Sequence, residues 1–310
     1  MVGERFSVSF QRTLRIPEDG QTYPLPPTLG PFSIHRVADF AEKMPAGWRQ
    51  PGAFFVPMYQ REALWLGFGG EDWKPNAVVV EVGGVNAISG EVGAQGLQSL
   101  KQNYLVTPDQ PWLDGINAGD GFIHQFVATP LGVGLSVEGQ ITGTEDIGGL
   151  QLTVYEPKPG SFPDEPPQTL PYLPYQEAMG MEMGLGAGGR ITQKIHQDPY
   201  GIDVWDRANC ETVRVFILNS QQYREVTGLE PPPTAVSVDT YVEYGLPWFE
   251  LYDESARDVP AASSLAGLKT VAGAVEAKQK FTAADLPTRR IELRDGNAIA
   301  DNTKGANQDE

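Results

Sequence analysis

Apolar and polar residues alternate along several short stretches of this chain, and the alternation predicts β-strands. Between residues 5 and 16 the even positions are apolar except for Arg12, while the odd positions are all polar. A period of two is typical of a strand that buries one face and exposes the other. Residues 213–218 are apolar on both faces except at Arg214, which indicates a strand buried on both sides.

Glycine-rich turns separate further strand-like stretches. VVVEV and VNAIS flank Gly83 and Gly84, and paired glycines between such runs indicate a tight β-hairpin. Residues 122–128, 135–142 and 150–155 then alternate in the same way. Strands joined by short connections usually pair in antiparallel fashion, so we expect these three to form a meander. The alternation would place His124 on one strand face with Phe122 and Phe126.

Helical spacing of apolar residues is confined to short stretches. Ser33 is placed to cap a short helix, and a second helix is expected over residues 221–227. The clearest helical pattern runs over residues 263–278, whose apolar positions share one face. Residues 179–189, MGMEMGLGAGG, are too rich in glycine for a stable helix and predict a loop.

The composition favours turns over long helices. The chain of 310 residues has 35 glycines and 26 prolines, about one residue in five, whereas the typical share is about 12%. Its 30 aromatic residues supply enough bulk for a packed interior. We therefore predict a mainly β fold, with α+β as the alternative. The expected architecture is an antiparallel β-sandwich or open barrel with a few short peripheral helices.

A proline-rich segment divides the chain. Seven prolines fall within residues 157–174, and such a segment stiffens into an extended linker or strap. We predict a β-rich core domain over residues 1–160, a linker or strap over 161–176, a second half of strands and short helices over 177–294 that can pack on the same core, and a disordered tail over 295–310.

Charge and cysteine content narrow the partners and the compartment. The formal net charge of −17 repels phosphate backbones and anionic membrane surfaces, so we expect neither nucleic acid nor membrane as a partner. The lone Cys210 cannot form a disulfide within the chain, which favours a reducing compartment. The first residues do not resemble a signal peptide. We therefore expect a soluble, cytoplasmic protein.

The best candidate for a binding site is the polar loop over residues 114–120 and its flanks. Asp114, Asn117 and Asp120 offer the oxygen ligands that Ca²⁺ or another divalent cation prefers, although their spacing of three differs from that of an EF-hand. Turn chemistry explains the same residues without a metal, so no cofactor is our first expectation. Trp112 before the loop and His124 after it complete the candidate site.

No catalytic set stands out. The sequence GLSVEG around Ser136 has one residue more than a nucleophile elbow. Cys210 lies fourteen residues after His196, so a Cys–His pair is conceivable, but a lone cysteine usually acts as a small buried apolar residue. These patterns favour a protein without enzymatic activity.

The stretch DGINAGDGFIHQFVATPLGVG, with its lead-in PDQPWLDG, resembles a family of uncharacterised bacterial and fungal proteins. RIPEDGQTYPLPPTLG, PMYQREALWLGF and LPWFELYD are also similar to it, and together the similarity covers most of residues 12–255. The family commonly carries arginine at the position of His124. It has no known activity, so the resemblance implies none here.

Two classes of function remain. The first is a binding or self-assembling structural protein, with a protein partner or a second copy as the expected contact. The alternative is a hydrolase or a metal-dependent binder with an acidic site around residues 114–120 and His124. The small-molecule ligand of either is not specified by these patterns.

Overall fold

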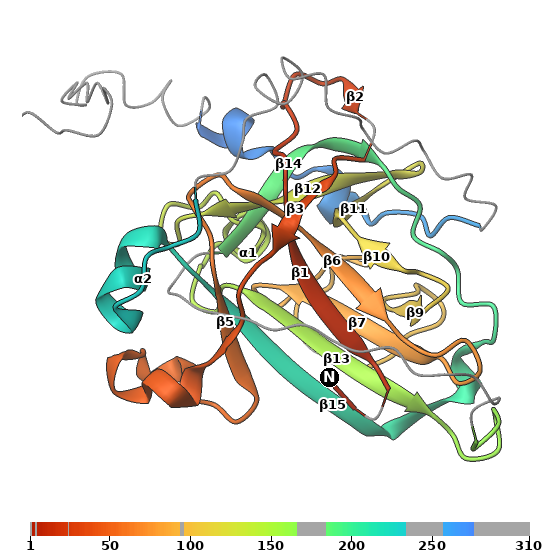
Figure 1. Cartoon of the computed structure of the whole chain (residues 1–310). Coiled ribbons are helices and arrows are strands. Elements are labelled where there is room, and N and C mark those ends of the chain that lie inside the picture. Colours follow the sequence, from red (N-terminus) through yellow and green to blue (C-terminus); the bar gives the residue numbers. More distant parts are fainter. Residues whose placement is uncertain are drawn as a thin grey trace, which may run out of the picture. The chain divides into compact units, whose positions relative to one another are not determined.

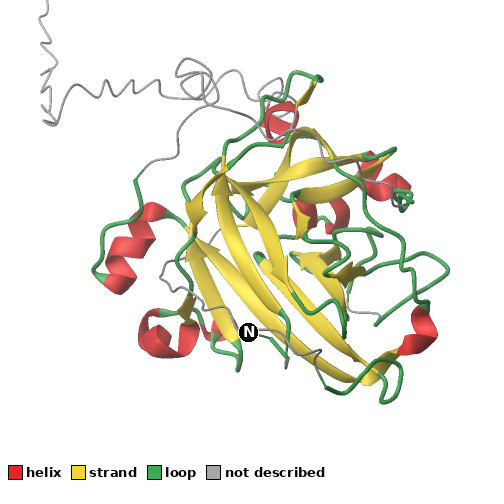
Figure 2. Ribbon diagram, turned by 45° about the vertical axis from the view of Figure 1, so that its right-hand side comes forward, coloured by secondary structure: helices red, strands yellow, loops and turns green. Residues whose placement is uncertain are grey.

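Two β-sheets packed face to face form the framework of the chain (Figures 1 and 2). The computed structural model describes residues 2–3, 5–23, 25–93, 96–165, 184–233 and 257–275. One sheet has eight strands in the order β2-β14-β12-β6-β1-β3, with β10 beside β6 and β11 beside β12. The other has seven, in the order β4-β5-β15-β13-β7-β8, with β9 beside β7. The mainly β fold with a few short helices is thus confirmed.

The strands of the eight-stranded sheet are β1 (Ser7–Thr13), β2 (Thr22–Tyr23), β3 (Thr28–Pro31), β6 (Ala63–Gly69), β10 (Trp112–Leu113), β11 (Gly115–Gly119), β12 (Phe122–Thr129) and β14 (Gly184–Thr192). Those of the seven-stranded sheet are β4 (His35–Arg36), β5 (Ala53–Pro57), β7 (Asn76–Val82), β8 (Val85–Asn86), β9 (Leu105–Thr107), β13 (Leu150–Pro157) and β15 (Trp205–Leu218). The described helices are α1 (Val137–Thr142), α2 (Ser220–Thr227), α4 (Ser263–Ala266) and the 3₁₀-helices Val37–Lys43, Ala46–Trp48 and Ile202–Val204.

Among the strands in the described ranges, neighbours are antiparallel except at two places. β2 runs parallel to β14, and β5 runs parallel to β15. The predicted strand near the N-terminus is β1, which pairs with β6 over its whole length. The predicted hairpin is β7–β8, where Gly83 and Gly84 take φ values of 54° and 75°, as the two central residues of a type I′ turn require.

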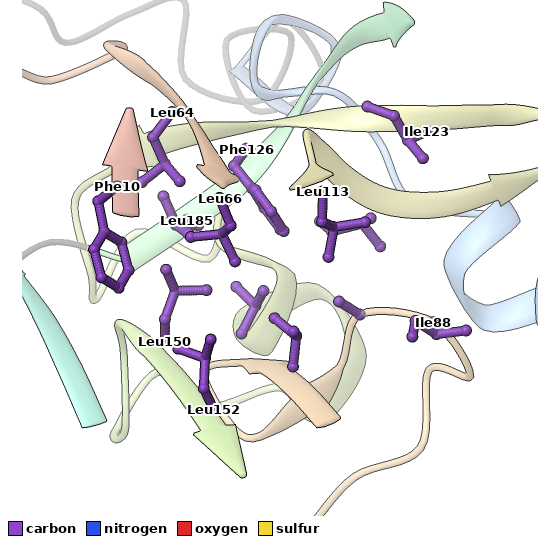
Figure 3. Packing of buried hydrophobic residues seen from close by; sticks show 14 of the residues in the cluster. Phe10, Leu64, Leu66, Ile88, Leu113, Ile123, Phe126, Leu150, Leu152 and Leu185 are labelled. Atoms are coloured by element: carbon purple, nitrogen blue, oxygen red, sulfur yellow. The ribbon is translucent and has the colours of Figure 1, made fainter. Parts of the chain in front are cut away.

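The main hydrophobic core lies between the two sheets. Figure 3 shows Phe10, Leu66 and Phe126 of the eight-stranded sheet directed toward Leu150 and Leu152 of the other sheet. All five side chains are at most 2% exposed. Burial of this apolar surface is the main force that holds the sheets together.

Strands from both sides of the proline-rich segment complete the same sheets. β12 pairs with β14, and β13 pairs with β15, although residues 166–183 separate them in the sequence. Met1–Val275 forms one compact unit. Residues 166–183 and the predicted tail over 295–310 lie outside the described residues.

The predicted strand over residues 135–142 is wrong, because this stretch contains helix α1. The Ser136 hydroxyl accepts a hydrogen bond from the Gly139 amide (3.0 Å) and caps the helix. Inside the helix the buried Glu138 carboxylate accepts three backbone N–H groups of residues 146–148, each at 2.9 Å. The polar residues that resembled a wet strand face therefore bind the backbone locally.

The predicted meander is also wrong. With residues 135–142 helical, β12 and β13 do not pair, and they belong to different sheets. The connection through α1 carries the chain from one layer of the sandwich to the other. A short, glycine-rich connection is compatible with either path, so its length could not reveal the crossover.

The part of the predicted glycine-rich loop that is described, Gly184 onward, is strand β14. Its glycines fit where a side chain would collide with a neighbour. A Cβ atom at Gly186 would lie 2.6 Å from Val271 Cγ2, and one at Gly188 would lie 2.5 Å from Val127 Cγ2. Close packing, which leaves no alternating pattern in the sequence, explains this strand.

The helix predictions have mixed outcomes. Helix α2 is confirmed, with Asn219 as its cap and Gly228 in the left-handed conformation at its end. The helix expected after Ser33 is a 3₁₀-helix that begins at Val37, and no side chain caps it. The predicted helix over residues 263–278 ends at Ala266 and resumes only after Thr270, which forms a bridge with β14.

Candidate functional site

Asn117, one of the residues predicted as a site, anchors neighbouring backbone. Asn117 on β11 is 1% exposed, and its amide donates to the carbonyl groups of Ile88 (3.3 Å) and Val259 (3.0 Å). Its side-chain oxygen accepts the Gly119 amide at 2.9 Å. The Asn117 side chain therefore joins β11 to two distant segments.

Asp114 and Trp112 lie where the chain enters β11. Asp114 is 3% exposed, and its amide donates to Gln193 Oε1 at 2.9 Å. The Trp112 carbonyl accepts hydrogen bonds from the side chains of Gln110 (3.1 Å) and Gln193 (3.3 Å). The glutamine side chains thus fix the backbone of this loop.

Asp120 and His124 lie farther along the same hairpin. Asp120 is exposed in the tight turn between β11 and β12, at a φ of 55°. His124 is 8% exposed on β12, directly opposite Arg190 of β14. The strand face that was predicted to carry His124 between Phe122 and Phe126 is not continuous, because the pairing register of β12 with β14 shifts after His124. Ile123 and Phe126 both enter the main core as a result (Figure 3).

No metal group is evident among the described residues, since no three His, Cys, Asp or Glu side chains there are placed to hold an ion. Metal binding by Asp114, Asn117 and Asp120 therefore stays a prediction, although the Asn117 side chain is already used by backbone groups.

A different group of polar residues gathers at one end of the seven-stranded sheet. Gln102 and Gln110 hold the segment around β9 against the segment after β14. Gln110 Oε1 accepts the His196 amide at 2.8 Å, and Gln102 Oε1 accepts the Asp198 amide at 2.8 Å. The Gln102 side chain also donates to the His196 carbonyl at 2.9 Å. Side-chain amides here replace the hydrogen bonds of a regular ladder.

This arrangement creates a cluster that we call the acidic rim, which consists of Asp72, Asp109, His196, Asp198 and Tyr200. Its residues come from three loops: the β6–β7 loop, the β9–β10 loop and the segment between β14 and β15. In Figure 1 the first and third of these loops lie at the right-hand side of the view. His196 Nδ1 lies 2.9 Å from the Asp109 carbonyl oxygen.

Asp198 accepts the hydrogen bonds that hold the rim in place. One carboxylate oxygen accepts Tyr104 Oη (2.5 Å) and Trp205 Nε1 (2.9 Å). The other accepts the amides of Tyr200 (2.8 Å) and Gly201 (3.1 Å). Burial and the hydrogen bond to Asp198 raise the pKa of Tyr104, so its phenol remains a donor. Four donors on a single carboxylate fix the position of the whole loop.

Asp109 and Tyr200 are the rim groups with perturbed acidity. Partial burial raises the pKa of Asp109, and the negative charges of Asp72 and Asp198 raise it further. A hydrogen bond from Tyr200 and the charge of His196 act in the opposite direction. Burial and the Asp109 charge likewise raise the pKa of Tyr200. The negative charges gathered here repel one another, and a bound positive charge would reduce that repulsion.

Aromatic rings flank the carboxylates. Tyr200 is 40% exposed, and its ring packs edge-on against Phe162, with centroids 5.1 Å apart, and against the buried Trp205, with centroids 6.2 Å apart. These neighbours hold the Tyr200 ring in place while leaving part of it open to solvent.

Sequence reasoning missed the rim because its members lie far apart along the chain. Asp109 and His196 are 87 residues apart, and the stretch Asp198–Gly201 reads as an ordinary turn. The signal that the sequence offered was the presence of glutamine side chains, such as Gln102 and Gln110, near these segments. This signal indicates a site only once the segments around β9 and after β14 are known to be neighbours.

Comparisons with protein-family models, curated proteins and solved structures gave no match. None of the helices in the described ranges is long and apolar enough to cross a membrane.

Proposed function

We propose that this protein is a binding protein whose acidic rim captures the cationic group of a small organic ligand. The observation that carries the proposal is the exposed Tyr200 ring, held beside the Asp109 carboxylate and within the field of two further carboxylates. An ammonium group gains both from the negative potential and from contact with an aromatic face. Neutral or anionic ligands would gain from the second contact at most.

The rim suits an organic cation better than a bare metal ion. Ca²⁺ takes six to eight oxygen ligands, as a rough rule. Both oxygens of Asp198 are already occupied by protein donors, which leaves Asp109 and Asp72 as the available carboxylates of the rim. Methyl and methylene groups of an organic ammonium would instead pack on Tyr200.

Hydrolysis is the alternative class of function, and the contacts of Asp198 disfavour an Asp109–Asp198 pair for it. Carboxylate-based hydrolysis needs one carboxyl group as the acid and a second as the base or nucleophile. Asp109 has the raised pKa expected of an acid. The nearby Asp198 carboxylate accepts four hydrogen bonds from the protein and therefore has a structural role.

A titration followed by NMR tests the proposal. We expect choline to shift the Tyr200 ring signals saturably, and 3,3-dimethylbutanol, its neutral counterpart of the same shape, to leave them unchanged. Asp109→Asn should weaken choline binding by about fivefold, since one close ion pair at a partly exposed site contributes about 1 kcal/mol.

The Asp19–Tyr23 pair offers a matched control. Tyr23 Oη donates to Asp19 Oδ2 at 2.6 Å in an exposed position, so the pair has the same chemistry outside the rim. Asp19→Asn should leave choline binding unchanged. The proposal is rejected if choline causes no saturable shift, or if the neutral alcohol binds equally well.

A further inference from the structure

A tract of three prolines, residues 231–233, follows helix α2 and is bound by side chains of two other segments. Tyr59 Oη, in the turn between β5 and β6, donates to the Pro232 carbonyl at 2.9 Å. Arg12 Nη2 of β1 donates to the Pro233 carbonyl at 2.6 Å. Because proline has no backbone N–H group, the tract cannot form a regular strand ladder. Two side-chain donors therefore bind consecutive carbonyl groups of the tract.

The sequence favours an extended conformation for the tract. Proline restricts its own φ to near about −65°, and a residue that precedes proline favours the β or polyproline II region. Glu230, Pro231 and Pro232 each precede a proline. A polyproline II helix has no internal hydrogen bonds, so its carbonyl groups are open to donors from a neighbouring surface. Proline-rich peptides use this preformed conformation when they dock on sites lined by aromatic residues.

One buried carboxylate positions both donors. Glu62 Oε1 accepts hydrogen bonds from Arg12 Nε at 2.8 Å and Nη2 at 2.6 Å, and Glu62 Oε2 accepts the Tyr59 amide at 2.8 Å. The Tyr59 carbonyl accepts the Glu62 amide at 3.0 Å and closes the turn. None of these four bonds involves the proline tract, so the two donors are preorganised for a ligand.

Backbone strain occurs in the same turn. Arg61, which lies between Tyr59 and Glu62, has a φ of 69°, and it is one of two non-glycine residues with positive φ in the described part of the chain. Strained residues of this kind gather at ligand clamps and active sites. The strain at Arg61 therefore agrees with a binding role for the turn.

We propose that Tyr59 and Arg12 form a receptor site for proline-rich peptides, which residues 231–233 occupy in cis and which a proline-rich segment of a partner protein can occupy in their place. The tract seated on the site specifies the occupant, because its carbonyl groups already accept from both donors. We call these two residues the proline site. It shares no residue with the acidic rim, so it does not depend on the binding of a cation there.

The tract is held loosely enough to be exchanged. Pro231 and Pro232 are only half-buried, and Pro233 is exposed. The ion pair beside the tract, between Glu230 and Arg224, is exposed on both sides and adds little. A free peptide still competes with a tethered tract, whose effective concentration is about millimolar. We therefore expect trans binding to become visible when the tract is weakened.

A variant that opens the site tests the proposal. In the full chain, Pro231→Gly/Pro232→Gly/Pro233→Gly removes the preformed tract and keeps Tyr59 and Arg12. We expect a hexaproline peptide to shift the Tyr59 ring and Arg12 Nε–H signals saturably in NMR spectra of this variant. The wild-type chain should show no shift at the same peptide concentration, because its own tract fills the site.

Controls separate recognition of proline from a general peptide contact. Hexaglycine offers carbonyl groups without the preformed conformation and should not bind the triple variant. Adding Tyr59→Phe should weaken hexaproline binding about fivefold, as expected for the loss of one neutral hydrogen bond. Tyr23→Phe should leave it unchanged, because the Tyr23 hydroxyl donates to Asp19. Absence of a saturable hexaproline shift, equal binding of hexaglycine, or unchanged affinity with Tyr59→Phe overturns the proposal.

A milder variant applies if the triple substitution prevents folding. Pro232→Gly interrupts the tract at its centre and retains the two outer prolines. Hexaproline should bind this variant more tightly than the wild-type chain, because the interrupted tract competes less well for the proline site. Equal binding to the two chains, or binding to neither, rejects the exchange of the tract.

Discussion

Arg12 of β1 and Glu62, the residue just before β6, form an ion pair away from solvent. Arg12 donates to Glu62 Oε1 through Nε at 2.8 Å and through Nη2 at 2.6 Å, and the two side chains are 9% and 2% exposed. The Tyr59 amide donates to the other Glu62 oxygen at 2.8 Å, while Arg12 also donates to the Pro233 carbonyl at 2.6 Å. The single polar intruder on the apolar face of β1 thus has a buried partner.

Removal of one member of this pair should be strongly destabilising. Arg12→Ala leaves a buried carboxylate whose pKa is already raised by burial, and we expect a loss of about 3–5 kcal/mol in the free energy of unfolding. Urea denaturation at pH 7 measures it. The double variant Arg12→Met/Glu62→Met, which leaves no charge unpaired, should recover part of the loss.

An exposed pair of the same chemistry serves as the control. Arg224 Nη2 lies 2.6 Å from Glu230 Oε2, with side chains 58% and 79% exposed. Arg224→Ala should change the unfolding free energy by less than about 1 kcal/mol. Equal losses for Arg12→Ala and Arg224→Ala would contradict a buried pair at Arg12.

The strands that the sequence predicted correctly are those in which burial alone sets the pattern. In β1 and just beside it, the buried Phe6, Phe10 and Leu14 all fall at even positions, so a period of two is visible. In β14 glycines fit closely against Val127 and Val271, and only Leu185 and Ala187 carry side chains between Gly184 and Gly189, too few to display a period. Strand prediction from alternation fails where close approach of backbones replaces side-chain packing.

Local hydrogen bonding explains the other differences between the sequence-based predictions and the structure. Glu138 satisfies three backbone amides and therefore points inward from a helix, although its position in the sequence suggested a wet strand face. Asn117 was predicted as a site residue, and its side chain hydrogen-bonds to backbone groups. The acidic rim needs the Asp109 and Asp198 carboxylates close enough to interact, which only the tertiary fold determines. Sequence patterns identify polar residues with a role more readily than they identify the role.

His35 should make the protein sensitive to acid. Its ring stacks on Phe55 at a centroid distance of 5.7 Å, and Nε2 has no hydrogen-bond partner among the described residues. Burial lowers the pKa of His35 from 6.5 to about 3. Because the unfolded chain binds the proton first, His35 lowers stability progressively as the pH falls from about 6.5 to about 3.

The substitution His35→Phe should remove this part of the acid sensitivity. Between pH 7 and pH 4.5 the wild-type chain should lose about 2–3 kcal/mol more stability than the variant, since each pKa unit corresponds to about 1.4 kcal/mol. Urea denaturation at both pH values gives the difference. His35→Leu checks that the result does not depend on ring packing. Identical pH dependence in wild type and both variants would show that the His35 pKa is not lowered.

Glycine at position 188 should be required for β14 to pack. A Cβ there would lie 2.5 Å from Val127 Cγ2 and 3.0 Å from the Gln125 carbonyl oxygen, so Gly188→Ala should destabilise the fold by about 1–3 kcal/mol. Gly47 is the control, because a Cβ at that position would meet nothing within 4 Å. Gly47→Ala should be neutral or stabilising by up to about 1 kcal/mol. A comparison of urea midpoints decides, and equal effects would contradict the close packing of β14.

The acidity of Asp109 should respond to each neighbour in a defined direction. Asp72→Asn removes a negative charge and should lower the pKa of Asp109, whereas Tyr200→Phe removes a hydrogen bond to the carboxylate and should raise it. Titration of ¹³C-labelled carboxyl groups by NMR follows both changes. Asp19 supplies the reference, because the hydrogen bond from Tyr23 lowers its pKa, and Tyr23→Phe should raise it.

Choline should shift the same titration if it binds at the rim. A cation beside Asp109 stabilises the charged carboxylate, so the pKa of Asp109 should fall as choline is added and that of Asp19 should not move. By linkage, choline should also bind more weakly as the pH falls through the raised pKa of Asp109. If both Asp72→Asn and Tyr200→Phe left the Asp109 pKa unchanged, the carboxylates would be too far apart to interact, and the rim would lose the electrostatic basis for attracting a cation.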